Sequence, residues 1–148
     1  MNTSAPSHPN ILLVDDNQDG LLVRRTLLQE MGYGVSTARN GEEGLKLFER
    51  GGFDVVVTDY RMPRMSGAEL IQRIRKLNPN ARIILLSGFV EPLGLTEENT
   101  GADVIIAKSA NEPAHLIRCV KRLLNRATRR KPPASQKRPA ARAKASSR

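Results

Sequence analysis

The sequence predicts an α/β fold, with a doubly wound, five-stranded parallel sheet and helices on both of its faces. Five short apolar runs are separated by segments that mostly predict helices, and in the first of these segments apolar residues recur at helical spacings of three, four and seven. The apolar runs are nearly continuous, which is typical of strands buried on both faces of a parallel sheet. Because strands that alternate with helices build right-handed βαβ units, the pattern favours one sheet between two layers of helices.

The first half of the chain contains three predicted strands and two predicted helices. The first helix ends at Gly32 and Gly34 and the second at Gly51 and Gly52, because glycine favours helix termination. The strands are predicted at Asn10–Val14, Tyr33–Ala38 and Phe53–Thr58. The apolar residues that define the helices are Leu21, Leu22, Val23, Leu27, Leu28 and Met31 in the first, and Leu45, Leu47 and Phe48 in the second, Glu42–Arg50.

The second half of the chain repeats the alternation with one interruption. Pro92 and Gly94 disfavour a long helix in residues 89–101, whose apolar positions show no clear period. We therefore expect a short, shifted or mobile helix in that segment. The other predicted elements are helix Ala68–Leu77, strands Arg82–Leu86 and Val104–Ala107, and helix Pro113–Arg126.

The net charge of +9 is confined to the C-terminal end of the chain. Residues 1–125 hold 15 basic and 15 acidic side chains, whereas residues 126–148 hold nine basic side chains and no acid. The terminal segment has no large apolar residue, so it cannot bury enough surface to order itself. We expect a flexible leader at 1–8, one domain at 9–126 and a disordered basic tail at 127–148. Either nucleic-acid binding or simple solubilisation would explain the tail.

The composition also narrows the cellular location and the metal chemistry. A single cysteine, Cys119, cannot form an intrachain disulfide, and Met1–Asn10 contains no apolar signal segment. The longest apolar runs, such as Ile83–Leu86, fall far short of the roughly 20 residues that cross a bilayer. We therefore expect a cytoplasmic protein without a membrane span. With two His and one Cys, oxygen atoms are the only plausible metal ligands.

Polar side chains follow the predicted strands where each strand ends: Asp15 and Asp16, then Asp59, Ser87 and Lys108. Each residue alone could be a helix cap or a solvated charge. However, parallel strands place their carboxyl ends at one edge of the sheet, where ligands bind. Two carboxylates about 4 Å apart repel by roughly 4 kcal/mol at an effective dielectric constant of 20, so three of them predict a cation in their midst. A few oxygen ligands with room for water and a phosphate oxygen suit Mg²⁺.

A calcium loop is the competing interpretation of the first acidic cluster. Asp15, Asn17, Asp19 and Gly20 match the first half of an EF-hand loop. The twelfth position of that loop is Thr26 where a bidentate Glu is required, and the preceding segment is a predicted strand where a helix is required. The calcium interpretation is therefore disfavoured.

The motifs together resemble the receiver domains of the response regulators of two-component signalling. The resemblance runs from about Asn10 to Arg126 and implies the flavodoxin-like strand order 2-1-3-4-5. Each motif alone is weak, but they occur in order and after the expected strands. The motifs are Val14–Asp16, Asp59–Gly67, Ser87-Gly88, and Gly101–Asp103 shortly before Lys108.

The resemblance implies a chemical role for each site residue. Asp59 would be the phosphoacceptor, a carboxylate nucleophile that takes a phosphoryl group from a phosphohistidine and forms an acyl phosphate. The other implied roles are Mg²⁺ binding by Asp15, Asp16 and the main-chain carbonyl of Arg61 together with Asp59, hydrogen bonding of a phosphoryl oxygen by Ser87, and pairing of the phosphate with Lys108.

The resemblance also implies partners. The donor would be a sensor histidine kinase or a histidine phosphotransfer protein, and the output would be a changed surface that binds a downstream protein. We expect a monomer or weak homodimer that is not an enzyme for a separate substrate, although it would assist its own phosphorylation and dephosphorylation. No output domain is expected after Arg126, so the chain would be a stand-alone receiver.

The sequence departs from the family pattern on the face that the family uses for output. Ser87 and the residue three positions before the lysine form the family's switch, and that residue is Ile105 here instead of an aromatic. Ser109 replaces the usual proline after the lysine, which removes the main reason to expect a cis peptide bond. Two alternatives therefore stay open: a degenerate receiver that acts as a phosphorylation-independent interaction module, and nucleic-acid binding through the tail.

Overall fold

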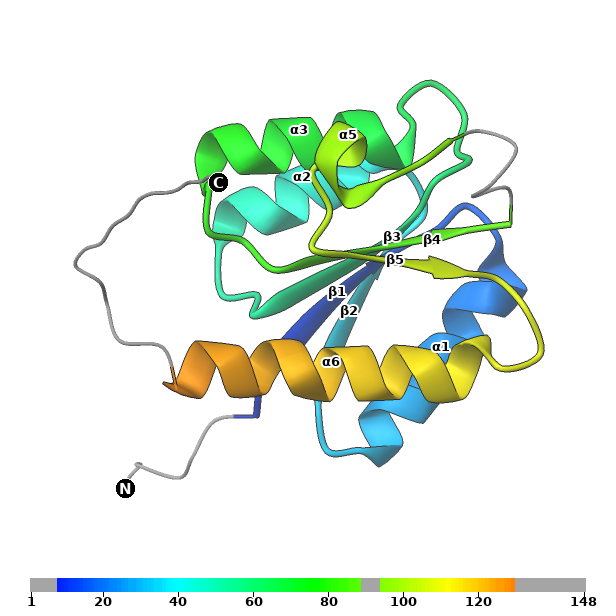
Figure 1. Ribbon diagram of the computed structural model, residues 1–148, viewed down its shortest axis with the longest axis vertical. Coiled ribbons are helices and arrows are strands. Elements are labelled where there is room, and N and C mark those ends of the chain that lie inside the picture. The colour runs from blue at the N-terminus through cyan, green and yellow to red at the C-terminus, as the bar shows by residue number, and fades with distance from the viewer. Residues whose placement is uncertain (1–7, 89–93, 130–148) are drawn as a thin grey trace, which may run out of the picture.

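The computed structural model describes residues 8–88 and 94–129, in which strands and helices alternate along the chain (Figure 1). The strands are β1 (Asn10–Val14), β2 (Gly34–Ala38), β3 (Val55–Asp59), β4 (Ile83–Ser87) and β5 (Val104–Ala107). The helices are α1 (Gln18–Glu30), α2 (Gly41–Arg50), α3 (Gly67–Leu77), α5 (Glu97–Thr100) and α6 (Glu112–Arg129). The predicted α/β class is confirmed.

The strands form one parallel sheet in the order β2-β1-β3-β4-β5. In register, β1 pairs Val14 with Thr58 of β3, and β4 pairs Ser87 with Ala107 of β5. The residues that follow these strands therefore leave the sheet at the same edge. The expected doubly wound order is confirmed, and with it the convergence of the strand ends.

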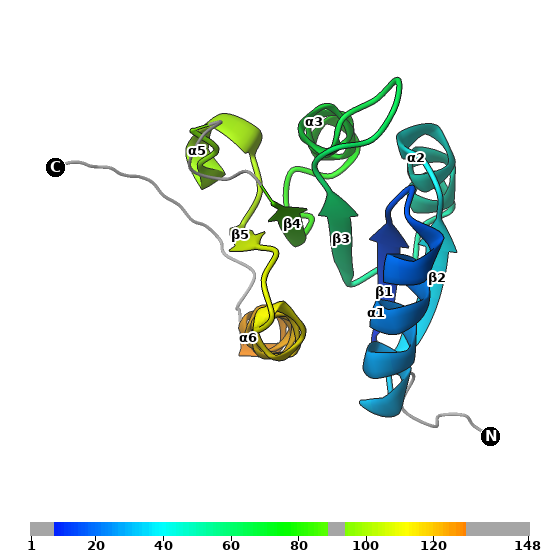
Figure 2. The same ribbon diagram turned by 90° about the vertical axis from the view of Figure 1, so that its right-hand side faces the viewer.

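Two layers of helices cover the sheet: α1 and α6 lie on one face, and α2, α3 and α5 lie on the other (Figures 1 and 2). Alternate side chains of each strand enter opposite layers. In β1, Ile11 and Leu13 pack with α1 and α6, whereas Leu12 and Val14 pack with the other layer. Burial on both faces explains why the strands are nearly continuous apolar runs.

The first helix has a different buried stripe from the one its leucines suggested. Leu21 and Leu28 are buried, but Leu22 and Val23 are each 53% exposed. The reason is that Arg24, which lies three residues after Leu21 and four before Leu28, occupies a position on the buried side of α1. Leu77, the last residue of α3, is also an exposed large apolar side chain.

The described part of the segment between β4 and β5, from residue 94 onward, contains one short helix, as expected. Helix α5 has four residues and begins with a capping box in which Thr96 and Asn99 bond each other's backbone. Gly101 ends it with a left-handed φ of 84°. Residues 89–93, which include Pro92, lie outside the described residues.

Helix α6 continues to Arg129, three residues beyond the predicted end of the last helix and into the segment expected to be a tail. The predicted leader is described only at its last residue, and of the predicted tail only 127–129 are described. Among the helices of the described ranges, none is both long enough and apolar enough to cross a membrane.

Candidate functional site

Three carboxylates lie together at the edge formed by the ends of β1 and β3. One carboxylate oxygen from each of Asp15, Asp16 and Asp59 lies within 4.8 Å of the others. Asp15 is 3% and Asp59 6% exposed, while Asp16 faces solvent. We call these three residues the acid cluster. Hard oxygen donors, two buried and one exposed, form a partial ligand set that fits Mg²⁺ and leaves coordination positions for other oxygens.

Lys108 brings a cation to the acid cluster from the end of β5. Its Nζ lies 2.5 Å from Oδ1 of Asp59. The position of Lys108 is fixed by its backbone, because its N–H donates to the carbonyl oxygen of Ser87 at 2.9 Å. Ser87 is the last residue of β4 and is 2% exposed. The structure thus brings together the side chains of Asp15, Asp16, Asp59 and Lys108, and it places Ser87 at the end of the adjoining strand β4.

The pKa of Asp59 is set by its burial and by nearby groups of both charge signs. Burial raises the pKa of Asp59 above its ordinary value, and the charge of Asp15 raises it further. The hydrogen bond and charge of Lys108 and the charge of Arg24 act in the opposite direction but do not fully offset the burial. A divalent cation in the acid cluster would favour the ionised carboxylate, which is the nucleophilic form.

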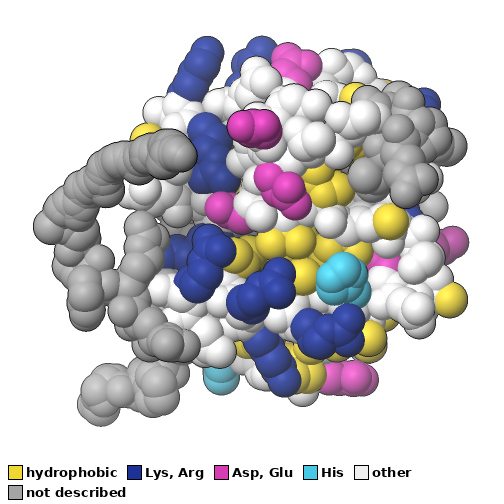
Figure 3. Space-filling view, in the orientation of Figure 1, with side chains coloured by type: hydrophobic (Ala, Val, Ile, Leu, Met, Phe, Trp, Pro, Cys, Tyr) yellow, Lys and Arg dark blue, Asp and Glu magenta, His cyan; other side chains and the backbone are white. Residues whose placement is uncertain are grey.

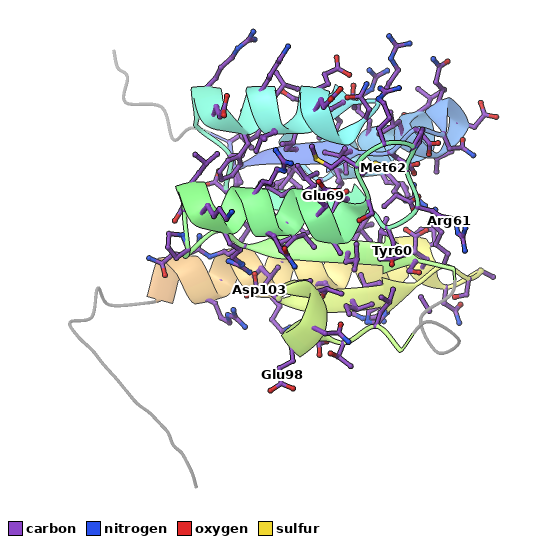
Figure 4. The ribbon with its side chains drawn as sticks, turned by 90° about the horizontal axis from the view of Figure 1, so that it is seen from above. Tyr60, Arg61, Met62, Glu69, Glu98 and Asp103 are labelled. Atoms are coloured by element: carbon purple, nitrogen blue, oxygen red, sulfur yellow. The ribbon has the colours of Figure 1, made fainter. Side chains whose placement is uncertain are left out.

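The loop after β3 is held close to the acid cluster by backbone contacts. The N–H of Gly67 donates to the carbonyl of Tyr60 at 2.8 Å, and a Cβ at Gly67 would lie 2.2 Å from the main-chain oxygen of Asp59. Only glycine fits there. Figure 4 shows Tyr60, Arg61 and Met62 in this loop, with Arg61 two residues after Asp59. Arg61 is therefore placed in the loop that flanks the cluster.

The expected switch residues lie on neighbouring strands. Ser87 is buried at the end of β4, and Ile105 is half-buried in β5, where it pairs in register with Leu85 and packs on the α2, α3 and α5 side of the sheet. The described residues contain no cis peptide bond, in line with the serine at position 109.

The structure argues against the calcium loop. The side chain of Asn17 accepts the N–H of Gly20 at 3.0 Å and caps α1, so a helix begins inside the would-be loop. The segment before the motif is strand β1. Asp19 belongs to the first turn of α1, and among the described residues it is not part of the acid cluster.

Sequence reasoning missed a buried ion pair beside the acid cluster. Arg24 donates from Nη1 to Oδ2 of Asp15 at 3.0 Å, and from Nη2 and Nε to the two carboxylate oxygens of Glu112 at 2.9 and 3.2 Å. The pKa of Arg24 is raised, because Glu112 and Asp15 outweigh the lowering effect of burial. A signal existed: Arg24 is in phase with Leu21 and Leu28, and Glu112 is in phase with Leu116 and Val120, which are buried.

Comparison with known families gives one match over most of the described chain. The family model described as "Response regulator receiver domain" matches residues 11–121. Among curated proteins, a response regulator receiver protein of Anaeromyxobacter is 39% identical over 79 residues, covering 53% of this chain and 33% of that protein. A probable transcriptional regulator of Cyanidium caldarium is 37% identical over 100 residues, covering 67% and 40%. The chain thus spans about a third to two fifths of these relatives.

Solved structures with similar folds carry similar descriptions. A response regulator receiver domain protein from Clostridium thermocellum has a TM-score of 0.74 at 30% identity, covering 81% of this chain and 97% of that one. The response regulator protein TrrA of Thermotoga maritima, in complex with Mg²⁺ and BeF, has a TM-score of 0.70 at 39% identity, covering 78% and 98%. A complex of TrrA with the histidine kinase ThkA matches with a TM-score of 0.70 at 40% identity, with the same coverage.

Proposed function

The chain belongs to the response regulator receiver domain family of two-component signalling, and on that basis we propose that it accepts a phosphoryl group on Asp59. The carboxylate of Asp59 attacks the phosphorus of a phosphohistidine, the phosphorus–nitrogen bond breaks, and the imidazole leaves as an acyl phosphate forms. The observation that carries the proposal is the placement of a buried Asp59 between two other carboxylates and the ammonium of Lys108.

Mg²⁺ would be held by Asp15, Asp16, Asp59 and the main-chain carbonyl of Arg61. When bound, it neutralises charge on the oxygens of the phosphoryl group and of the attacking carboxylate. The support from this chain is the donor set: three carboxylate oxygens within 4.8 Å of one another. The relative TrrA has been crystallised with Mg²⁺ and BeF, which supports the same site here.

Lys108 and Ser87 would hold the phosphoryl group once it is on Asp59. The Nζ of Lys108 already reaches Oδ1 of Asp59, so a small movement brings it to a phosphoryl oxygen as a compact point charge. Ser87 lies at the end of the strand next to β3, where its hydroxyl can donate to another phosphoryl oxygen. These two groups stabilise negative charge without taking part in bond making.

The phosphoryl donor would be a sensor histidine kinase or a histidine phosphotransfer protein, supported by the ThkA–TrrA complex among the structural relatives. We place the protein in the cytoplasm, as a monomer or weak homodimer. It acts on no separate substrate, and its own residues assist phosphorylation and dephosphorylation of Asp59. Its output would be an altered surface near Ser87 and Ile105 that a downstream protein recognises.

Beryllofluoride binding separates this proposal from a degenerate, phosphorylation-independent module. Beryllofluoride mimics a phosphoryl group on a carboxylate, so with Mg²⁺ it should give a bound fluorine NMR signal that disappears in Asp59→Asn. Asp54→Asn, an exposed aspartate before β3, serves as a matched control. Absence of a bound signal with the unaltered protein would support the degenerate module.

The exposed face of α6 favours nucleic-acid binding as a second function. Arg118, Lys121 and Arg122 are exposed and lie on the side of α6 away from its buried residues, and Figure 3 shows Lys and Arg side chains gathered over this helix. Within the described ranges, no acidic side chain forms a salt bridge with these three. Residues 126–148 add nine basic side chains. From Glu112 to Arg126, the exposed residues of α6 are polar or basic, apart from Ala114, which suits phosphates better than a lipid surface.

A further inference from the structure

A buried guanidinium connects the acid cluster to the first turn of α6. Arg24 of α1 forms a two-pronged contact with both carboxylate oxygens of Glu112 and a third contact with Oδ2 of Asp15. The three side chains are only 11%, 7% and 4% exposed. A buried fork of this kind is a strong, directional contact, and loss of one partner leaves an uncompensated charge.

The surrounding backbone leaves space for this contact. A Cβ at Gly20 would lie 2.8 Å from Nη1 of Arg24 and 3.3 Å from Oδ2 of Asp15, so the absence of a side chain at this position allows the two to meet. At the other end, the N–H of Glu112 donates to the carbonyl of Ser109 at 3.1 Å. The contact is therefore held from both helices.

Two side chains of the segment from Lys108 to Glu112 are connected to the acid cluster. Lys108 contacts Asp59 directly, and Glu112, four residues later, reaches Asp15 through Arg24. A change in the charge of the cluster therefore acts on both ends of this short connection between β5 and α6.

Both carboxylate oxygens of Asp15 already accept a hydrogen bond, and each keeps a second lone pair that a metal could use. Its Oδ1 accepts the N–H of Asn17 at 3.0 Å, and its Oδ2 accepts Nη1 of Arg24 at 3.0 Å. A divalent cation that enters the acid cluster must share Asp15 with Arg24, and the two cations repel. Glu112 offsets this repulsion, because it holds the same guanidinium from the other side.

We propose that Arg24 is a positioning residue that couples cation occupancy of the acid cluster to the first turn of α6 through Glu112. Filling the cluster weakens the contact of Arg24 with Asp15 and strengthens its contact with Glu112. By linkage, the factor by which the cation favours the Arg24–Glu112 contact equals the factor by which that contact raises the affinity of the cluster for the cation. Loss of the Glu112 charge should therefore lower that affinity. The inference rests on the proposed Mg²⁺ site.

Mg²⁺ titration of full-length variants by calorimetry tests the coupling. Glu112→Gln leaves the positive charge of Arg24 without its offset, so the dissociation constant for Mg²⁺ should rise about fivefold. The double variant Arg24→Met with Glu112→Gln removes both charges and should bind Mg²⁺ at least as tightly as the unaltered protein. Glu69→Gln is the matched control, because it removes the partner of Arg73 in an exposed pair on α3 and should leave the constant unchanged (Figure 4).

Amide exchange supplies a second readout that does not depend on the size of the affinity change. Mg²⁺ should increase protection in the first turn of α6, residues 112–116, and the increase should be lost in the double variant. If Mg²⁺ binds all variants equally and protection of 112–116 does not respond, the coupling is wrong while the Mg²⁺ site stands. If the unaltered protein does not bind Mg²⁺, both the site and the coupling are wrong.

Discussion

The ammonium of Lys108 and the carboxylate of Asp59 are in direct contact, with Nζ 2.5 Å from Oδ1, yet the pKa of Asp59 stays above its ordinary value. Burial of Asp59 and the nearby charge of Asp15 outweigh the favourable contact with Lys108. Counted formally, the four carboxylates of Asp15, Asp16, Asp59 and Glu112 face only two cations, Lys108 and Arg24, so negative charge is in excess. This imbalance favours binding of a cation at the acid cluster, and it lowers the stability of the folded protein when no cation is bound.

Asp59→Asn should stabilise the fold at neutral pH. A carboxyl group whose pKa is raised in the folded state binds more protons when folded, so it costs stability as pH rises above its ordinary pKa of 3.8. We expect a gain on the order of 1 kcal/mol at pH 7, a rise in melting temperature of about 4 °C. The gain should grow between pH 3.8 and the raised pKa and then level off, as measured by thermal melts without Mg²⁺. A gain that is the same at pH 3 and pH 7 would contradict the assignment.

Gly67→Ala should distort the loop that flanks the acid cluster. The added Cβ would lie 2.2 Å from the main-chain oxygen of Asp59, and backbone cannot move aside as a flexible side chain can. We expect a loss of about 2 kcal/mol in the free energy of urea unfolding, within the range for overpacked sites. Gly88→Ala, whose Cβ meets nothing within 4 Å, is the control and should lose much less.

Mg²⁺ should bind weakly and through the acid cluster, because the protein offers few oxygens and the ion keeps several waters. Asp16→Ala and Asp59→Ala should each raise the dissociation constant about tenfold or more, as metal-site changes usually do. Asp19→Ala, at the start of α1, should leave it unchanged. Tight binding that survives Asp16→Ala would place the ion elsewhere, and Ca²⁺ binding that depends on Asp19 would revive the calcium loop.

The basic surface of α6 should bind duplex DNA with strong salt dependence. In the triple variant of Arg118, Lys121 and Arg122 to Ala, the slope of log K against log salt should fall by about 0.9 for each phosphate that the protein no longer neutralises. The triple variant Lys46→Ala, Arg50→Ala and Lys76→Ala removes the same charge from exposed positions of α2 and α3 as a control. Fluorescence anisotropy between low and moderate salt measures both. Equal slopes for both variants would exclude α6, and binding to anionic vesicles alone would exclude nucleic acid.

The sequence was a good guide to the strands and to the strand-end residues for a simple physical reason. Strands of a parallel sheet are buried on both faces, so β1, β3 and β4 are continuous apolar runs. The carboxyl ends of parallel strands share one edge of the sheet. Local sequence alone therefore predicts that the residues at these ends lie close together. Asp15 just after β1 and Asp59 at the end of β3 are examples.

Side-chain pairing across the chain could not be predicted in the same way. Arg24 and Glu112 are 88 residues apart, and only the packing of α1 beside α6 brings them together. The leucine pattern of α1 indicated the wrong buried stripe. Leu22 and Val23 are apolar but exposed, whereas the charged Arg24 lies on the buried side of the helix. Local periodicity reports which residues share a face but not which face is covered.

The most direct test of phosphoacceptor function is the intact mass of the full chain after incubation with acetyl phosphate and Mg²⁺. We expect a gain of the mass of one phosphoryl group that is absent without Mg²⁺, absent in Asp59→Asn, strongly reduced in Lys108→Ala and retained in the control Asp54→Asn. Because an acyl phosphate reacts with hydroxylamine, the added mass should disappear on treatment with it. No added mass in the unaltered protein with any small phosphoryl donor, or a gain that persists in Asp59→Asn, would contradict phosphoryl transfer to Asp59.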